Sequence, residues 1–423
     1  MKIFKFGGAS VKDASGVRNV AQIIRLFPLD KLVVVVSAMG KTTNALENLC
    51  EAYYSGTGKA AGILEEIRSF HLQIAKELFP LSAHPIHDEL HNTLVELEWA
   101  IEGPPECSFD QEYDQIVSVG EMLATRMVAA YLQEQQIRTK WWDARDLICT
   151  DSTWREGKVD WDLTREHVHS QLIPFLEKTE TQVVLVQGFV GATPDNYTTT
   201  LGREGSDYTA AILAFCTDAE SVSIWKDVPG VLNADPKWFD ETKLIEQLSY
   251  QDAIELAYYG ATVIHPKTIK PLQNKDIPMY VRSFLAPREK GTLINNVQTP
   301  LPIPCFIFKV NQLLISLSPK DFSFIVEENM SSIFRLFSEH KVKINTMQNS
   351  AISFSICADQ DSRKIPGLIK ALQEDYRVLY NDDVELITIR YYDQATIDRV
   401  CIGKKVLLEV KSRYTVQLVV RQA

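Results

Sequence analysis

The sequence lacks paired cysteines, long apolar runs and an excess of basic residues, and each absence excludes a class of protein. Its seven cysteines are scattered and never form a C-x-x-C pair, which argues against a disulfide framework and favours a reducing, cytoplasmic setting. No apolar run approaches the ~18 residues of a membrane span, and we expect no signal peptide. Lys and Arg number 44 against 55 Asp and Glu, a net charge of −11, which disfavours nucleic acid and membranes as partners.

What the sequence does contain is the composition of an ordinary globular protein. Its 423 residues are 45% hydrophobic and 23% charged, enough for two or three domains. Strand and helix patterns alternate over the first ~290 residues, with continuous apolar runs at 31–37 and 182–187. They predict an α/β fold, a mostly parallel sheet covered by helices on both faces. Residues 43–102 are helical in pattern without any strand, and further helices are expected over 111–136 and 204–215.

A proline-rich stretch at 299–304 marks the expected boundary between two domains, because alternating prolines there cannot continue a helix. We predict one domain at 1–298 and a smaller α+β domain at 299–423. In the smaller domain, helices are expected at 331–340 and 365–375. Together with the strands they give a strand–helix–strand–strand–helix–strand order, typical of a ferredoxin-like unit. The expected strands lie at 313–317, 350–357, 385–390, 406–410 and 416–420.

The chain begins with a short strand that delivers Lys5 to a Gly7-Gly8 turn. Glycine backbone N–H groups can approach an anion closely and the lysine adds a charge, so this pattern predicts a phosphate cradle. The alternative is a strand that ends in a flexible turn. A Walker motif is disfavoured, because the G-x-x-x-x-G-K-[ST] spacing is absent here and Val35 replaces the first glycine before Gly40-Lys41-Thr42.

Two further segments carry unusual charges. The polar stretch 198–211 runs into an amphipathic helix, and helix N-termini bind anions. Ser206 or Asp207 would be an ordinary N-cap in the alternative interpretation, which leaves Arg203 unexplained. Glu121 lies among apolar residues on a helix, so its carboxylate needs a cationic partner or ligand.

The loop at 226–237 follows a predicted buried strand and is dense in Asp, Pro and Gly. Ligands bind beyond the carboxyl ends of parallel strands, so this position suits a nucleotide, although a plain turn-rich connection is the alternative. His84, His87 and His91 occur at helical spacing but lack the H-E-x-x-H pattern. We interpret them as an exposed helix face and expect no metal bound by the protein itself.

Together these segments resemble the aspartokinases, which are amino-acid kinases. The matching motifs are KFGGASV (5–11), VSAMGKTTN (36–44), SVGE (118–121), QGFVGA (187–192), TTTLGREGSDYTAA (198–211), KDVPGVLNADP (226–236) and YGATVIHPKT (259–268). The remainder resembles the family's ACT regulatory region. The resemblance implies ATP-dependent phosphorylation of the L-aspartate β-carboxylate to 4-phospho-L-aspartate, the first step towards lysine, threonine and methionine. It also implies Mg²⁺ bound through the ATP phosphates.

The resemblance also implies roles for individual residues. Lys5 would contact the transferring phosphoryl group, and Asp207 would organise the reaction centre. Arg203 would offer a planar fork to the α-carboxylate, and Glu121 an anion to the α-ammonium. The aspartate-binding positions would be Ser37, Thr43, Glu121, Phe189, Arg203 and Ser206. The ATP-binding positions would be Lys5, Gly7, Gly8, Lys226, Asp227, Leu232, Lys237, Thr262 and Val263.

Three residues near the expected nucleotide depart from the family's usual pattern: Ala9, Leu232 and Thr262. They support one alternative, a catalytically weak amino-acid sensor in which the ACT-like region is the functional part. Lys5, Glu121, Arg203 and Asp207 are all present, which argues against it. A second alternative is a kinase for another amino acid, such as glutamate.

The ACT-like region departs further from the family. One ACT unit would span about 313–380, and the second would combine 305–309 with 384–423 and be truncated. Asn345 stands where lysine-sensitive relatives often have aspartate, which disfavours lysine as the effector and leaves threonine or no effector open. ACT units normally pair through sheet edges and helices, so we expect a homodimer.

Overall fold

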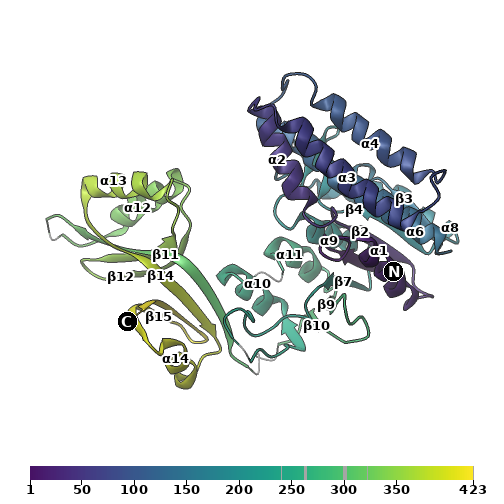
Figure 1. The fold of residues 1–423 in the computed structure, drawn as a ribbon. Helices are drawn as coiled ribbons and strands as arrows, with labels where there is room; N and C mark the ends of the chain where they lie inside the picture. Colours follow the sequence, from purple (N-terminus) through teal and green to yellow (C-terminus); the bar gives the residue numbers. More distant parts are fainter. Residues whose placement is uncertain (240, 262–263, 299–302, 322, 423) are drawn as a thin grey trace. The chain divides into compact units, whose positions relative to one another are not determined.

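The computed structural model describes residues 1–239, 241–261, 264–298, 303–321 and 323–422, which form two compact units (Figure 1). The first unit comprises Met1–Val231, Leu244–Ile254 and Val263–Gln298. The second comprises Leu232–Lys243, Glu255–Thr262 and Thr299–Ala423. The domain boundary at 298 stays a prediction, because the proline-rich residues 299–302 lie outside the described ones.

An eight-stranded sheet forms the centre of the first unit, in the order β3-β4-β2-β1-β7-β9-β10-β8. All neighbouring strands run parallel except the antiparallel pair β9 and β10, so the predicted mostly parallel sheet is confirmed. The strands are β1 (Lys2–Phe6), β2 (Leu32–Val36), β3 (Thr139–Trp142), β4 (Val183–Gln187), β7 (Ser221–Lys226), β8 (Gln247–Ser249), β9 (Met279–Ser283) and β10 (Thr292–Asn295). A separate hairpin pairs β5 (Val190–Ala192) with β6 (Thr198–Thr200).

Helices cover this sheet, and the predicted helical insertion over 43–102 is confirmed as three of them. The helices of the unit are α1 (Ala14–Arg25), α2 (Thr42–Tyr54), α3 (Ala60–Leu78), α4 (Ile86–Ala100), α5 (Phe109–Val117), α6 (Val119–Glu134), α7 (Trp161–His167), α8 (Ile173–Lys178), α9 (Gly205–Thr217), α10 (Tyr250–Tyr259) and α11 (Pro266–Asn274). The last residues of α10 belong to the second unit. Short 3₁₀ and π-helical segments lie at Ala144–Asp146 and Val168–Leu172.

The expectation of one helix over 111–136 is wrong, because α5 ends and α6 begins at Ser118. Serine and glycine are poorer helix formers than alanine, and Ser118 and Gly120 flank the break. Gly120 also allows a close approach, since a Cβ there would lie 2.9 Å from the Ala38 Cβ. The break therefore brings the start of α6, with Glu121, against the end of β2.

Strand β1 sorts its side chains by the two-residue period of a strand. Phe4 and Phe6 enter the main core beneath α1 and α6, where they pack with the fully buried Trp225 of β7. The Phe6 and Trp225 rings stack with centroids 6.1 Å apart. Lys5 therefore points to the opposite face, where α9 packs against β1, β2 and β7.

The second unit contains a six-stranded antiparallel sheet in the order β12-β13-β11-β14-β16-β15, with the character of the expected ACT-like region. Residues 305–309 pair with 386–390 at one end of the long strands, and 312–319 pair with 376–384 at the other. The strands are β11 (Cys305–Pro319), β12 (Ile344–Asn349), β13 (Phe354–Asp359), β14 (Tyr376–Arg390), β15 (Lys404–Lys411) and β16 (Thr415–Gln422). The helices are α12 (Glu327–Glu339), α13 (Ile365–Asp375) and α14 (Gln394–Cys401).

The strand expected over 350–357 is wrong in its first half. Residues 350–353 form the turn between β12 and β13, closed by a hydrogen bond from Ser350 N to Ser353 O. The sequence pattern concealed β12 because its residues are mostly polar and show no alternation of apolar and polar side chains. Truncation of the second ACT unit stays a prediction.

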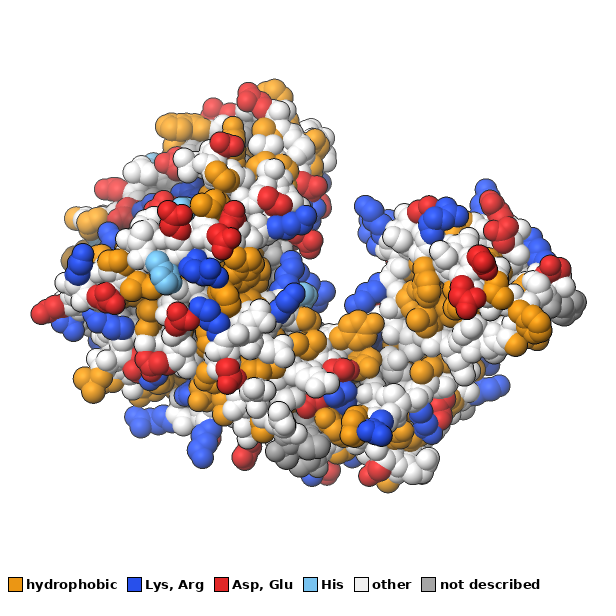
Figure 2. Space-filling model, turned by 180° about the vertical axis from the view of Figure 1, so that it is seen from behind, with side chains coloured by type: hydrophobic (Ala, Val, Ile, Leu, Met, Phe, Trp, Pro, Cys, Tyr) orange, Lys and Arg blue, Asp and Glu red, His pale blue; other side chains and the backbone are white. Residues whose placement is uncertain are grey.

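Among the described residues, no helix is long and apolar enough to cross a membrane. Figure 2 shows acidic and basic side chains interspersed over the visible face of each unit, without an extended patch of one sign. This distribution suits the modest negative net charge of the chain.

Replacing Trp225 by alanine should destabilise the first unit by about 3–5 kcal/mol, because the substitution leaves a large cavity among Phe4, Phe6 and Phe27. Denaturant unfolding followed by circular dichroism measures this change. Trp99→Ala is the matched control, since Trp99 is 67% exposed on α4 and its removal should change stability by at most about 0.5 kcal/mol. Equal effects of the two substitutions would contradict this account of the core.

Candidate active site

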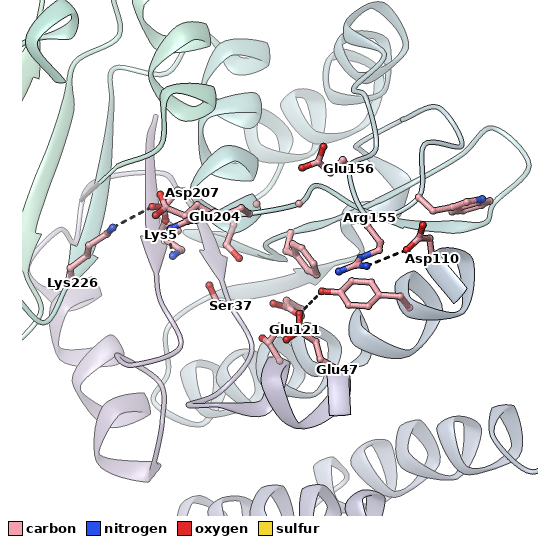
Figure 3. A pocket seen from close by; sticks show the side chains of 18 residues that line it. Lys5, Ser37, Glu47, Asp110, Glu121, Arg155, Glu156, Glu204, Asp207 and Lys226 are labelled. Carbon is pink, nitrogen blue, oxygen red and sulfur yellow. Dashed lines mark hydrogen bonds and ion pairs between the residues drawn. The ribbon is translucent and has the colours of Figure 1, made fainter. Parts of the chain in front are cut away.

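One cavity of about 770 Å³ in the first unit collects most of the predicted site residues (Figure 3). Of the residues assigned by resemblance to catalysis or aspartate binding, all line it: Lys5, Ser37, Thr43, Glu121, Phe189, Arg203, Ser206 and Asp207. Lys226, assigned to ATP, lines it as well. They come from distant segments, the ends of β1, β2, β4 and β7 and the beginnings of α2, α6 and α9.

A buried ion cluster occupies one end of the cavity. The Lys5 Nζ lies 2.7 Å from the Asp207 Oδ1, and the Lys226 Nζ lies 3.5 Å from the Oδ2 of the same carboxylate. Asp207 is 2% exposed and Lys5 8%. Burial alone would raise the pKa of Asp207, but the two ammonium groups outweigh burial and lower it. Two cations thus share one anion, and the cluster faces the cavity with an excess positive charge.

Glu121, in the first turn of α6, is only half satisfied. Its Oε1 accepts a hydrogen bond from the Ala38 N–H at 3.1 Å, whereas its buried Oε2 has no hydrogen-bond partner among the described residues. The side chain lines the cavity and is 2% exposed. Burial raises the pKa of Glu121 to about 8. A carboxylate oxygen left open in such a place suits a cationic ligand group.

Two tight approaches shape the wall around Phe189 and Ser206. A Cβ on Gly188 would lie 2.4 Å from the Ser206 Cβ, so only glycine fits between the end of β4 and the start of α9. Phe189 follows with a φ of 69°, and its N–H donates to the Thr209 Oγ1 at 2.9 Å. The strained residue is thereby fixed by α9, and its ring borders the cavity.

Arg203 differs from these neighbours. It is exposed, and within the described part of the chain its side chain has no hydrogen-bond or ion-pair partner. Glu204 follows it with a φ of 54°, and the Glu204 Oε2 is buried without a hydrogen-bond partner among the described residues. The turn before α9 therefore presents a guanidinium and a carboxylate to the cavity.

The structure adds lining residues that the sequence analysis missed: Glu47, Asp110, Tyr113, Trp154, Arg155, Glu156 and Glu204. Behind them lies Asp114, which is completely buried. Its carboxylate accepts from the Arg155 N–H and from both the N–H and the hydroxyl of Thr200. Burial, the largest influence, raises the pKa of Asp114 to about 6 despite these donors. The available signal was an aspartate among the apolar Tyr113, Ile116 and Val117 of α5.

The other positions assigned to ATP are not brought to this cavity. Gly7, Gly8 and Asp227 belong to the first unit but do not line it, and Leu232 and Lys237 belong to the second unit. Thr262 and Val263 lie outside the described residues. Packing explains why position 8 is a glycine, since a Cβ there would lie 2.6 Å from the Ala38 carbonyl oxygen. The nucleotide site therefore stays a prediction, and of its residues only Lys5 and Lys226 line this cavity.

Asn345, the tentative regulatory residue, lies in a buried polar network of the second unit. Its Oδ1 accepts from the Lys309 Nζ at 2.8 Å, and its Nδ2 donates to the Gln312 Oε1 and the Asp359 Oδ1. The side-chain amide is thus saturated by the protein's own residues. The regulatory role of Asn345 stays a prediction.

The expectation of an exposed helix face for the three histidines is wrong in part, because only His91 is exposed. His84 precedes α4, and both His84 and His87 are half-buried against Phe79. His84 stacks on Phe79 with ring centroids 4.4 Å apart, and a ring nitrogen of His87 lies 3.0 Å from the Phe79 carbonyl oxygen. Within the described ranges, no group of three or more His, Cys, Asp or Glu side chains is placed to hold a metal ion.

Comparison with known proteins places this chain in a family. Residues 1–283 match the model of the amino acid kinase family. The lysine-sensitive aspartokinase 3 of Escherichia coli is 30% identical over 96% of this chain and 89% of its own length. A bifunctional aspartokinase/homoserine dehydrogenase of Arabidopsis thaliana is 28% identical over 88% of this chain, which spans only 42% of that longer relative.

A solved structure agrees with the sequence comparison. The crystal structure of E. coli aspartokinase III in complex with aspartate and ADP superposes with a TM-score of 0.82 at 27% identity. The match covers 99% of this chain and 96% of that one, so it includes both compact units. The chain belongs to the amino acid kinase family and, within it, to the aspartokinases.

Proposed function

We propose that this aspartokinase transfers the γ-phosphoryl group of ATP to the β-carboxylate of L-aspartate and forms 4-phospho-L-aspartate. One observation carries the proposal: a single cavity joins a lysine-rich ion cluster to the open carboxylate oxygen of Glu121. The related E. coli enzyme, solved with aspartate and ADP, supports these ligands. The product would enter lysine, threonine and methionine synthesis.

The cavity offers complementary groups for an acidic amino acid. The open Oε2 of Glu121 accepts the α-ammonium, and Arg203 offers its guanidinium to the α-carboxylate. The β-carboxylate then extends toward Lys5. An aspartate side chain has an unperturbed pKa of about 3.9 and is ionised at neutral pH, so the attack needs no general base.

The main barrier is repulsion between an anionic acceptor and a polyanionic donor. A β-carboxylate oxygen forms a bond to the γ-phosphorus, the bond from that phosphorus to the bridging oxygen breaks, and ADP leaves with the electron pair. Lys5 and Lys226 neutralise the charge on the phosphoryl oxygens, and Asp207 holds both lysines in place. The carboxylate of this cluster, Asp207, is already paired with two lysines, which fits Mg²⁺ ligated mainly by phosphate oxygens. When bound, Mg²⁺ would neutralise phosphate charge.

We also propose a homodimer through the second unit. Strands β12 and β15 are the two edges of its sheet, and exposed edges favour pairing with another chain. Large apolar side chains are exposed around this sheet, among them Met347 on β12 and Val406 on β15. Such side chains suit burial against a second copy.

An acyl-phosphate assay tests the proposed reaction. Hydroxylamine trapping of the product should give a hydroxamate with ATP and L-aspartate, and little with L-glutamate, because the extra methylene misplaces the reacting carboxylate. A preference for glutamate would identify a different amino-acid kinase. No product with either amino acid would favour the alternative of an amino-acid sensor.

Lys5→Ala should lower kcat by about 10²–10³-fold, because one cation directed at the phosphoryl group is lost and Asp207 keeps a single partner. Steady-state kinetics at saturating ATP and aspartate measure the effect. Lys2→Ala is the matched control, since Lys2 lies on the same strand and pairs with Asp30 away from the cavity. An unchanged kcat in the Lys5 variant would remove the role assigned to this residue.

The kcat/KM for aspartate should fall as the pH decreases below about 8. Burial raises the pKa of Glu121 to about 8 in the free enzyme, and the protonated carboxyl cannot pair with the α-ammonium. In the complex the ammonium favours the ionised form, so kcat itself should vary less with pH. Glu121→Gln should remove this pH dependence together with most aspartate affinity. The same acidic limb in that variant would assign it to another group.

A further inference from the structure

We propose that Arg155 is a second guanidinium of the acceptor site and binds the α-carboxylate of the amino-acid substrate together with Arg203. The inference rests on the proposed function, whose aspartate position it refines. Sequence analysis gave Arg155 no role, and its segment lies outside the motifs that resemble the family.

The backbone of Arg155 is fixed in an uncommon conformation. Its φ is 65°, in the left-handed region that non-glycine residues seldom adopt. The N–H of Arg155 donates to both carboxylate oxygens of Asp114, at 3.1 and 3.0 Å. The same carboxylate also holds Thr200 of β6, three residues before Arg203. The position of Arg155 is therefore tied to the wall that carries Arg203 and Ser206.

The guanidinium is held by its face and keeps donors available at its edge. It lies 4.3 Å from the centre of the Tyr113 ring, and its Nη1 pairs with the Asp110 Oδ1 at 3.2 Å. Tyr113 is itself fixed, because its hydroxyl donates to the Glu47 Oε1 at 2.6 Å. Among the described residues, the Nε and Nη2 of Arg155 make no hydrogen bond. Stacking leaves those edge donors free to bind a carboxylate.

The place of Arg155 in the cavity matches the shape of the substrate. Figure 3 shows Arg155 on the opposite side of the cavity from Lys226, with Glu121 between the two ends of the view. In an amino acid with a side-chain carboxylate, the two carboxylates diverge from the carbon that bears the ammonium. With the ammonium at Glu121 and the reacting carboxylate toward Lys5, the α-carboxylate points toward Arg155.

The test uses L-aspartate and its α-amide, L-isoasparagine, which keeps the ammonium and the β-carboxylate but loses the α-carboxylate charge. The wild-type enzyme should prefer aspartate strongly in kcat/KM. Arg155→Met should reduce this preference about 10-fold or more, mainly through the KM for aspartate, with the KM for ATP unchanged. Arg155→Lys should be intermediate, because it keeps a charge but loses the planar fork.

Arg138→Met is the matched control, since Arg138 is exposed and pairs with the exposed Glu180 outside the cavity. The preference of Arg138→Met for aspartate over isoasparagine should equal that of the wild type. The inference would be overturned if Arg155→Met kept the full ratio of kcat/KM for aspartate over isoasparagine. A wild-type ratio near one would also overturn it. Thermal melting of each variant shows whether it is folded. If Arg155→Met is unfolded, Arg155→Lys is compared with the wild type in its place.

Isothermal titration with aspartate and isoasparagine separates this inference from the proposed function. If the wild-type enzyme binds aspartate but forms no acyl phosphate, the proposed function fails, and the preference in Kd still tests Arg155. If aspartate binds equally well to the wild type and to Arg155→Met while acyl phosphate is formed, the inference fails and the proposed function stands.

Discussion

The buried pairing of Asp207 with Lys5 and Lys226 is the interaction on which the site depends. A carboxylate at 2% exposure is strongly disfavoured unless cations compensate its charge, and each lysine approaches a different oxygen. The pairing works only if β1, β7 and the first turn of α9 meet at one place. The aromatic packing of Phe4, Phe6 and Trp225 on the other face of the sheet secures that meeting. The fold of the sheet and the proposed phosphoryl-binding end of the cavity therefore depend on the same contacts.

Two other buried carboxylates show how structural and functional roles separate physically. Asp114 accepts hydrogen bonds from the Arg155 N–H, the Thr200 N–H and the Thr200 hydroxyl, so it has partners within the protein and joins α5 to β6. Glu121 has one partner and leaves an oxygen open in a cavity. Both have raised pKa values because of burial, so the pKa alone does not distinguish them. The two carboxylates differ in hydrogen bonding, because only Glu121 has an oxygen without a partner among the described residues.

The sequence predicted what depends on local pattern. The apolar runs at 31–37 and 182–187 became central strands, and the motif residues Lys5, Glu121, Arg203 and Asp207 now line one cavity. It did not predict features set by long-range contact. The break at Ser118 depends partly on the close approach of Ala38 to Gly120, and the exposed half of β12 has no apolar alternation. The backbone of Arg155 is held by Asp114, which lies 41 residues away in the sequence. The periodicity of helices and strands does not predict a contact between residues so far apart in the sequence.

The charge of the cavity bears on how the proposed anionic substrates would bind. Six carboxylate and four cationic side chains line it, an excess of negative charge around a site proposed for two anionic substrates. Two features limit the repulsion between the lining carboxylates and these substrates. Lys5 and Lys226 already compensate Asp207, and the raised pKa of Glu121 lets that group keep a proton at neutral pH until an ammonium arrives. In the proposed complex the ammonium replaces this proton as the partner of Glu121, so we expect binding of the amino acid to release a proton. In that complex, the negative charge of Glu121 would lie opposite the positive charge of the ammonium.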